Sequence, residues 1–578
     1  MNKMICFVLL LVGLTPTLGF VHSRFGNNIL RWNLQSLPGS VHTNVVNRNT
    51  RAVRYFLASD GWSTTNTAAE LNALRASFGQ WQSISGTILK FEDAGTVAPG
   101  VDVNTSDNRN VLFWARTSTL VNSGNDDISG ILGKTFNSFM ADGTLIEADI
   151  VFNGVDFPWF TDFSNTNTTA QFVESTALHE MGHFIGLAHS PAGSASMLYV
   201  GGDGVDNQAG LSADEIAAAR LIYMATNQIN PRATLKGQVT RSGVGILGAA
   251  IFVEDSATNI IAGAVTRSGG NYEMNALPPG TYQVRVAPLD ASGAFDWLVR
   301  GRDISSEFNS AETTFLPMSG TNVTLSAGVT NTLDLSVIAA SPAFRITHIR
   351  FPTADSNSYS FAGLPAALRP GQTNISVGVA AAGLPTSGAT LAITGDGLTT
   401  VGPMYFTGGG LNFISVRASV ATNATPGMRT LIVRQGTNAA YANGFLEILP
   451  SVPDYNFDGL DDTFQRRWFP LFTTTNAAPA ADPDGDKFPN SSEAVAGTNP
   501  TNATSLLKID QITQNASGAT VTWRSVAGKS YQLLFRSPIG AVGWTAVGTP
   551  VTAAGATAQK LDPNGVATNR FYRVQVLP

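Results

Sequence analysis

Three of the six histidines of this 578-residue chain lie within the eleven residues from His179 to His189. His179 and His183 are four positions apart, so on an α-helix both imidazoles lie on one face, one turn from each other. Gly186 follows, and glycine often ends a helix because it accepts left-handed backbone angles at little cost. The spacing therefore predicts a helix, a turn, and a return of His189 toward the first two histidines.

Three neutral imidazoles with one open coordination position are the ligand set of a catalytic zinc ion. Glu180 directly follows the first histidine, where its carboxylate can take a proton from a metal-bound water. Met197 lies eight residues after the third histidine. Together with Gly186 these residues form the extended zincin signature, which is far more specific than the first five residues alone. The alternative is histidines on a helix surface without metal, and it requires the whole pattern to be accidental.

The N-terminus and the composition set the context of this motif. Residues 1–19 have the pattern of a signal peptide: Lys3, an apolar run from Ile5 to Leu14, and small residues before Phe20. The alternative is a buried N-terminal strand. The net charge of −6, with only 13% charged residues, argues against nucleic acid as the main partner. No apolar run is long enough to span a bilayer. We therefore expect a secreted, extracellular protein without a membrane span.

A chain of this length needs several domains, because one hydrophobic core does not grow to 578 residues. The first is predicted to be an α+β domain over residues 20–227. Helical periodicity is found in three segments: 67–83, 169–184 and 211–224. A strand pattern at 147–153 lies directly upstream of the histidine motif. We predict that it is an edge strand, which an extended peptide substrate can join.

The order of these features resembles the metzincin clan of zinc endopeptidases, and within it the matrixins. The residues that carry the resemblance are Trp32, Phe78 to Trp81, Ala148 to Ile150, the histidine motif, Met197 and Leu211 to Tyr223. The resemblance implies a twisted mixed sheet with three helices and the hydrolysis of peptide bonds. It also implies that His179, His183 and His189 bind one catalytic zinc, that Glu180 is the general base, and that Met197 forms the turn beneath the metal.

Tyr199 follows this methionine by two residues, as a tyrosine does in the astacin and serralysin branches. The resemblance implies that it stabilises the oxyanion, and a packed loop tyrosine is the alternative. Two departures from animal matrixins are expected. Neither a prodomain nor a mature cysteine is expected, because the one cysteine, Cys6, lies in the signal segment. No structural zinc is predicted, because only His22, His42 and His348 lie outside the motif.

Two β modules are predicted next, at residues 228–340 and 341–450, from short apolar runs separated by turns rich in glycine and proline. The first resembles the carboxypeptidase regulatory-like sandwich, and the second is similar to an immunoglobulin-like sandwich. Such modules are spacers or platforms. A polysaccharide or a cell-surface matrix is the partner that we expect for them. Residues 505–578 resemble the small β-sandwich that ends many exported bacterial proteins.

Residues 451–504 contain two acidic loops. In the second loop, oxygen donors occupy the positions of a twelve-residue calcium loop: Asp482, Asp484, Asp486, the carbonyl of Phe488, Asn490 and Glu493. The first loop has the corresponding residues Asp454, Asn456, Asp458 and Leu460, but Gln465 replaces the final glutamate. The pair resembles thrombospondin type 3 and EF-hand-like repeats, which implies structural calcium. A solvated acidic linker is the alternative.

Two functions fit these patterns. One is a secreted metalloendopeptidase that acts on a protein or peptide. The other is a surface adhesion or carbohydrate- and matrix-binding protein whose zincin domain is vestigial. The intact Glu180 favours the enzyme.

Overall fold

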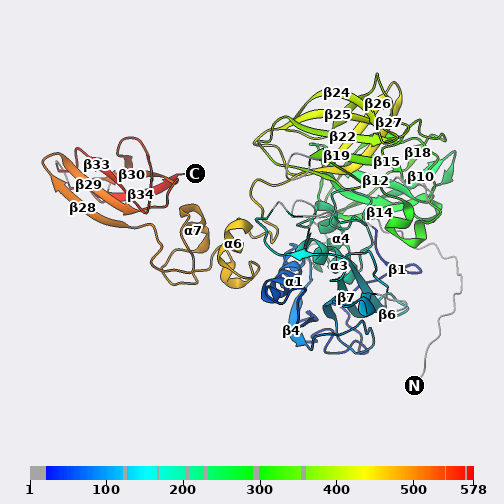
Figure 1. Cartoon of the computed structure of the whole chain (residues 1–578), viewed down its shortest axis with the longest axis horizontal. Helices are drawn as coiled ribbons and strands as arrows, with labels where there is room; N and C mark the ends of the chain where they lie inside the picture. The colour runs from blue at the N-terminus through cyan, green and yellow to red at the C-terminus, as the bar shows by residue number, and fades with distance from the viewer. Residues whose placement is uncertain are drawn as a thin grey trace. The chain divides into compact units, whose positions relative to one another are not determined.

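The computed structural model describes residues 21–121, 127–165, 168, 170–201, 208–226, 232–290, 298–352, 359–540, 542–566 and 569–577. It divides into two compact units, Met1–Ser451 and Val452–Pro578 (Figure 1). The predicted signal peptide, residues 1–19, lies outside the described residues. In the part of the chain that is described, no helix is both long and apolar enough to cross a membrane.

A five-stranded sheet organises the N-terminal part of the first unit, in the order β4-β3-β5-β7-β6. Its strands are β3 (Val53–Ala58), β4 (Phe91–Val97), β5 (Val111–Ala115), β6 (Gly133–Phe139) and β7 (Leu145–Asn153). All neighbours are parallel except β6, which runs antiparallel to β7 at the edge. The prediction of an edge strand at 147–153 is wrong. That segment belongs to β7, which lies inside the sheet because it pairs with β5 on one side and β6 on the other, and its residues 147–153 are buried.

Three helices accompany this sheet: α1 (Thr67–Gln82), α3 (Val173–Phe184) and α4 (Ala213–Tyr223). The predicted start of the motif helix, Thr169, lies outside the described residues. The described helix begins only at Val173, because Gln171–Phe172 form strand β9 paired with β8 (Trp159–Phe160). α1 packs on α3, and the indole Nε1 of Trp81 donates to the carbonyl of Leu178 at 3.1 Å. The shorter elements are β1 (Arg24–Phe25), β2 (Asn28–Ile29) and α2 (Ser118–Val121).

In its described residues, the second module contains one α-helix, α5 (Gly301–Ile304), and nine strands. These are β10 (Ala233–Arg241), β11 (Val244–Gly245), β12 (Ala249–Glu254), β13 (Ile260–Val265), β14 (Asn271–Leu277), β15 (Gly280–Pro288), β16 (Met318–Leu325), β17 (Thr330–Thr332) and β18 (Leu335–Val337). One sheet has the order β11-β10-β14, with β17 and β18 also paired to β10. Helix α4 packs against β13 and β14, so it lies between the two modules (Figure 1).

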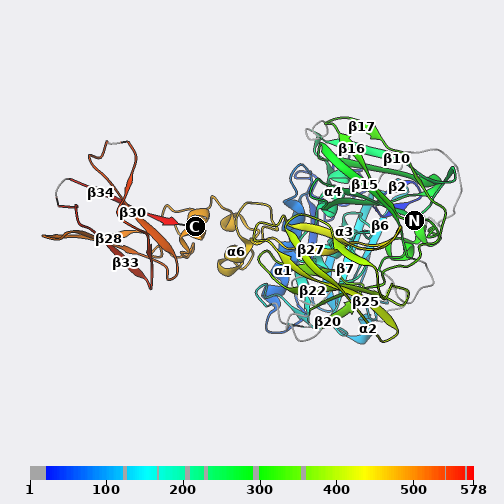
Figure 2. The same cartoon turned by 90° about the horizontal axis from the view of Figure 1, so that it is seen from above.

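The third module consists of strands β19 to β27. These are β19 (His348–Pro352), β20 (Tyr359–Ala362), β21 (Ala366–Leu368), β22 (Ile375–Ala381), β23 (Thr390–Ile393), β24 (Leu398–Gly408), β25 (Leu411–Val420), β26 (Gly427–Gln435) and β27 (Asn438–Ile448). One sheet, β20-β19-β22-β25-β24, is its own. Its strands β22 and β25 lie side by side in Figure 2. The other sheet is continuous with the second module, in the order β16-β15-β12-β13-β26-β27-β21, because Ile260 of β13 pairs with Met428 of β26.

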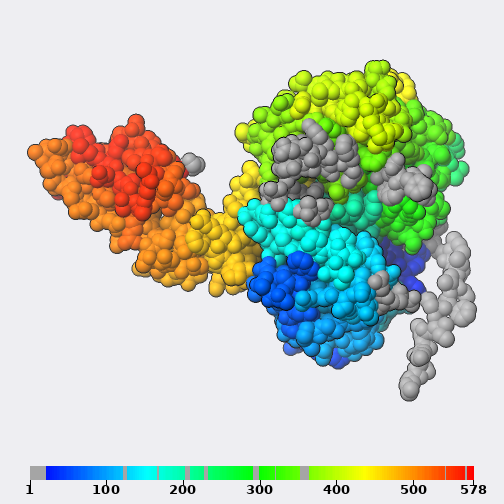
Figure 3. Space-filling view, viewed as in Figure 1, coloured from blue at the N-terminus to red at the C-terminus, as the bar shows by residue number. Residues whose placement is uncertain are grey.

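The apolar cores of the first unit also cross the module boundaries. One cluster runs from Trp32 and Phe184 to Leu235 and Ile251 of the second module. A second cluster joins Leu198 of the first module to residues of the other two, such as Phe252 and Phe445. The first three modules therefore form one packed body (Figure 3).

The second unit has its own small core around Trp523 and Tyr531. Its helices are α6 (Asp462–Trp468) and α7 (Asn490–Ala496). Its strands are β28 (Ile509–Asn515), β29 (Gly518–Arg524), β30 (Ser530–Arg536), β31 (Thr545–Ala546), β32 (Val551–Thr552), β33 (Thr557–Asp562) and β34 (Phe571–Leu577). They form two antiparallel sheets, β28-β29-β33 and β31-β30-β32, with β34 also paired to β30.

Candidate metal centre and acidic loops

The turn after helix α3 brings three histidines together. Gly186 has a φ of +99°, and a Cβ at this position would lie 1.9 Å from the carbonyl oxygen of Leu30. Only glycine therefore allows the chain to turn so close to the N-terminal segment. After the turn, the ring centroid of His189 lies 5.1 Å from that of His179 and 4.8 Å from that of His183. One nitrogen of each ring lies within 4.8 Å of the others.

Main-chain carbonyl groups fix the tautomer of each imidazole. The Nδ1 atoms lie at hydrogen-bond distance from carbonyl oxygens: His179 from Ser196 at 2.8 Å, His183 from Leu187 at 2.9 Å, and His189 from Asp303 at 2.5 Å. A carbonyl oxygen only accepts, so each Nδ1 carries the hydrogen. Each Nε2 therefore has a lone pair to offer, which is the form of histidine that binds a metal ion.

The Nε2 atoms of His183 and His189 lie 3.2 Å apart. Two lone pairs at this distance repel each other unless a cation lies between them. A proton is disfavoured there, because burial lowers the pKa of both rings; for His189 the neighbouring histidines lower it further. Burial, and then the charge of His183, lowers the pKa of His179 to about 3. A tetrahedral zinc ion with bonds of about 2.0–2.1 Å to nitrogen spans about 3.3 Å between two ligands, so the three histidines fit zinc.

Met197 packs directly beneath helix α3. A Cβ on Gly182 would lie 2.1 Å from the sulfur of Met197, so the glycine makes room for the thioether. Met197 is buried, and its main-chain N–H donates to the carboxylate of Glu215 at 2.9 Å. Glu215 also accepts from the main-chain N–H of Ser212 at 2.9 Å, which completes the capping box of α4. The last helix of the module therefore holds the methionine in place.

Glu180 is buried, with 4% of its surface exposed. The hydroxyl of Thr135, on edge strand β6, donates to its Oε2 at 2.7 Å. Burial raises the pKa of Glu180 to about 7, although the bond from Thr135 and the charge of Lys134 act in the opposite direction. A carboxyl group with a pKa near neutrality can both accept and release a proton at neutral pH.

Strand β6 was not recognised in the sequence as part of the site. It is the last strand of its sheet, and it lies along helix α3. The amide of Asn137 donates to the carbonyl of His183 at 3.2 Å. A Cβ on Gly133 would lie 3.1 Å from the Cγ of Glu180, so a larger residue would crowd the carboxylate. The sequence of β6 has no regular alternation of apolar and polar residues, and all seven of its residues are half-buried, so periodicity does not reveal this strand.

Tyr199 is half-buried and packs against the apolar cluster that the first module shares with the β modules. Its role in stabilising an oxyanion stays a prediction.

The second acidic loop contains buried oxygens without partners. The carboxylates of Asp482, Asp484 and Asp486 each place an oxygen within 4.8 Å of the others. Four buried oxygens accept no hydrogen bond: Oδ2 of Asp484, Oδ2 of Asp486, Oδ1 of Asn490 and Oε2 of Glu493. Burial, and then the neighbouring carboxylates, raise the pKa of Glu493 to about 7. Unpartnered oxygens are costly to bury, and a calcium ion would satisfy them.

The main chain of this loop has the curvature that such a site requires. Lys487, where glycine is usual, has a φ of +77°. Its N–H donates to Asp482 at 2.9 Å, and the N–H of Phe488 donates to Asp486 at 2.8 Å.

The first acidic loop satisfies more of its own oxygens. The Oδ2 of Asp458 accepts from the amides of Asn456 at 3.1 Å and Gln465 at 2.8 Å, and its Oδ1 accepts from the N–H of Leu460 at 2.9 Å. Asp454 accepts from the N–H groups of Asp458 and Gly459. Amide hydrogens thus occupy directions that a cation would need. Calcium at this loop stays a prediction.

Sequence comparison finds two domains in the chain. Residues 47–224 match the family model of matrixins, and residues 234–338 match that of the carboxypeptidase regulatory-like domain. No curated protein matches the chain in sequence.

Solved structures share only a distant likeness. The minor pilin GBS52 of Streptococcus agalactiae is 11% identical, with a TM-score of 0.14, over 19% of this chain and 46% of the pilin. The TIE protein of Bacillus anthracis is 11% identical, with a TM-score of 0.14, over 34% of this chain and 32% of that protein. The chain thus spans less than half of each, and scores this low support no argument about function.

The two family matches, and not these structures, assign domains to the chain: it contains a matrixin domain, followed by a carboxypeptidase regulatory-like domain.

Proposed function

We propose that this protein is a secreted zinc endopeptidase that hydrolyses peptide bonds. The observation that carries the proposal is the set of three half-buried imidazoles, each with Nδ1 on a carbonyl oxygen and Nε2 available to zinc, next to the buried Glu180. The matrixin domain at residues 47–224 supports a metallopeptidase independently of this geometry. The predicted signal peptide supports secretion. A surface adhesin with a vestigial zincin domain is not favoured, because the ligands and the glutamate are intact.

The chain's own residues divide the chemistry between them. When bound, zinc activates a water molecule and polarises the scissile carbonyl group. Glu180 takes the proton of the water and passes it to the leaving amine, and the burial that raises its pKa favours the uptake of the proton. Thr135 holds the Oε2 of this glutamate.

The substrate is a protein or peptide in an extended conformation. Strand β6 ends its sheet, so its outer edge offers main-chain N–H and C=O groups to another strand. It also lies beside helix α3, which carries His179 and Glu180. A peptide added to this edge would have its main chain aligned next to the metal centre.

Casein hydrolysis by the purified protein tests this function. Glu180→Gln removes the proton acceptor, and we expect kcat to fall by about 100-fold to 10,000-fold. Glu92→Gln is the matched control, because Glu92 lies on β4, at the opposite edge of the same sheet. A zinc chelator should abolish hydrolysis, and added zinc should restore it. Hydrolysis that persists in Glu180→Gln and in the presence of the chelator would contradict the proposal.

We also propose that the second acidic loop binds one structural calcium ion. The four buried oxygens without hydrogen-bond partners support it, since Asn490 and Glu493 are 0% and 1% exposed. Phe488 would add its carbonyl oxygen, at the seventh position of the loop.

A further inference from the structure

The third histidine is oriented by a different module from the other two. Ser196 and Leu187, which hold His179 and His183, belong to the matrixin domain. Asp303, which holds His189, lies 114 residues further along the chain. It belongs to helix α5, in the long connection between strands β15 and β16 of the carboxypeptidase regulatory-like domain.

The side chain of Asp303 restricts the position of the main-chain carbonyl of the same residue, because it is paired with Arg300. The guanidinium of Arg300 donates to both carboxylate oxygens of Asp303 at 2.7 Å, and the main-chain N–H of Arg300 donates to Oδ2 at 2.9 Å. Both side chains are more than nine-tenths buried. A buried bidentate pair of this kind restricts rotation of the turn and fixes the direction of the carbonyl.

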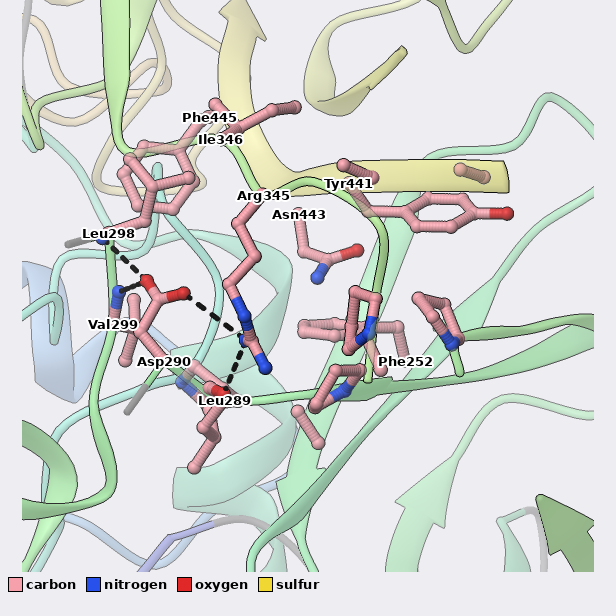
Figure 4. Close-up of a pocket in the computed structure, with 18 of the residues that line it drawn as sticks. Phe252, Leu289, Asp290, Leu298, Val299, Arg345, Ile346, Tyr441, Asn443 and Phe445 are labelled. Carbon is pink, nitrogen blue, oxygen red and sulfur yellow. Dashed lines mark hydrogen bonds and ion pairs between the residues drawn. The ribbon is translucent and has the colours of Figure 1, made fainter. Parts of the chain in front are cut away.

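Hydrogen bonds and an ion pair also hold the connection between β15 and β16 after it leaves β15 and before it reaches β16. Asp290 donates its N–H to the carbonyl of Val299 at 2.9 Å and accepts from the N–H of Leu298 at 2.7 Å. Arg345, which begins the third module, lies 3.6 Å from the Asp290 carboxylate and donates to the carbonyls of Leu289 and Thr313. Figure 4 shows Arg345 reaching toward Asp290 across a pocket at this junction.

The loop that follows His189 is braced by the third module. The N–H of Gly193 donates to the carbonyl of Asn443 at 2.9 Å, and the hydroxyl of Ser194 donates to the carbonyl of Gly444 at 2.6 Å. A Cβ on Gly193 would lie 2.4 Å from the ring of Phe445, so the two segments are in tight contact. The segment between the third histidine and Met197 is therefore packed on another module.

We propose that Asp303 is a positioning residue for His189, and that the matrixin domain binds zinc tightly only because the second and third modules hold its third ligand. The inference rests on the proposed zinc chemistry. His189 lies beyond the end of α3, so its ring lacks the support that the helix gives to His179 and His183. Hydrogen-bond partners of this kind change metal affinity by about 10-fold to 100-fold.

Zinc affinity of the full chain tests the inference separately from activity. Competition with a chromophoric chelator measures Kd for the wild type, Asp303→Ala and Asp290→Asn. We expect Kd to rise by about 10-fold to 100-fold in Asp303→Ala. Asp303→Asn should lie closer to the wild type, because its amide oxygen still accepts from Arg300. Asp334→Asn is the matched control: Asp334 lies in the same domain and accepts from the N–H of Gln238 at 2.9 Å.

A second measurement separates positioning from loss of fold. The visible absorption of the cobalt-substituted protein reports ligand geometry and should change in Asp303→Ala but not in Asp334→Asn. If Asp303→Ala does not fold, Asp290→Asn decides by the same two measurements, because it weakens the contacts of Asp290 with Leu298 and Arg345 and should raise Kd in the same direction. Asp303→Ala or Asp290→Asn protein that melts like the wild type and keeps its zinc Kd within twofold and its cobalt spectrum would overturn the inference. A wild-type chain that binds no zinc would instead overturn the proposed function.

Discussion

Single residues outside the histidine motif position the carboxylate of Glu180. Thr135 and Gly133, both on strand β6, lie beside its carboxylate, and the Thr135 hydroxyl also lies 2.9 Å from the main-chain carbonyl of Glu180. Neither lies near the motif in the sequence, and neither belongs to a recognisable pattern. Local spacing identifies the glutamate, but its hydrogen-bond partner depends on which strand the fold places beside helix α3.

Replacing the Thr135 hydroxyl tests whether it positions Glu180. Thr135→Val keeps the shape of the side chain but removes the donor. A hydrogen bond to a charged group contributes about 1.5–3 kcal/mol, so we expect kcat/KM to fall by about tenfold or more. Thr135→Ser should retain most activity, since it keeps the hydroxyl. Equal activity of Thr135→Val and the wild type on casein would show that the bond is dispensable.

A buried carboxylate on strand β7 makes stability depend on pH. Asp149 is 1% exposed and accepts from the N–H groups of Val111 and Asn104, each at 2.8 Å. Burial raises its pKa to about 6, although these two bonds act against the rise. The unfolded chain has the ordinary aspartate pKa of about 3.9, so the folded state holds the proton more tightly. The resulting stabilisation is complete below about pH 4 and is lost as pH rises through 6.

Urea unfolding at several pH values measures this effect. We expect the stability of the wild type, relative to that of Asp149→Asn, to fall between pH 4 and pH 7 by up to about 3 kcal/mol, since one pKa unit corresponds to about 1.36 kcal/mol. The asparagine does not titrate, so the difference between the two proteins isolates the carboxyl group. If the free energies of unfolding of the two proteins differ by the same amount at every pH in this range, Asp149 does not have this effect.

At the scale of elements, local patterns predicted helices better than strand neighbours. Helices α1 and α4 lie within the segments 67–83 and 211–224, whose periodicity predicted them. The prediction of an edge strand at 147–153 failed because the residues of β7 show that the strand is buried, but not that β6 pairs with its other side. Strand order also depends on long-range pairing: Phe56 of β3 pairs with Val111 of β5, whereas β6 joins β7 as a short antiparallel hairpin.

The second acidic loop is an element whose order we expect to depend on calcium. An ion bound only by the folded state at 100 times its Kd adds about 2.7 kcal/mol of stability. Calcium should therefore raise the melting temperature of the second unit by several degrees in the wild type. Glu493→Gln should abolish the shift, because it removes a buried ligand. Asp510→Asn, on strand β28 and outside both acidic loops, is the control. The same calcium response in Glu493→Gln and the wild type would refute the site.

In the whole molecule, the first three modules are not independent domains joined by linkers. They share apolar clusters and a sheet that continues from β13 to β26. The second unit has a separate core around Trp523. The β modules predicted as spacers or platforms are therefore also part of the packing around the metal centre.

Two truncations follow from this division. A chain that ends at Ser451 keeps both clusters of the first unit, so we expect its casein hydrolysis to equal that of the full chain. A chain that ends at residue 227 would expose apolar residues that pack on the second module, and we expect it to aggregate or to lose cooperative unfolding. Size-exclusion chromatography and thermal unfolding distinguish the two. A soluble, fully active domain ending at 227 would contradict the shared packing.

The sequence by itself determined whatever depends on neighbours along the chain. The spacing of His179, His183 and His189, the capping of α4 and the oxygens of the second acidic loop are all encoded within about a dozen residues. The tertiary structure alone decided that Thr135 binds Glu180 and that Asp303 holds His189. Those contacts join segments 45 and 114 residues apart. No local pattern specifies them, because they arise only when sheet order and module packing bring distant segments together.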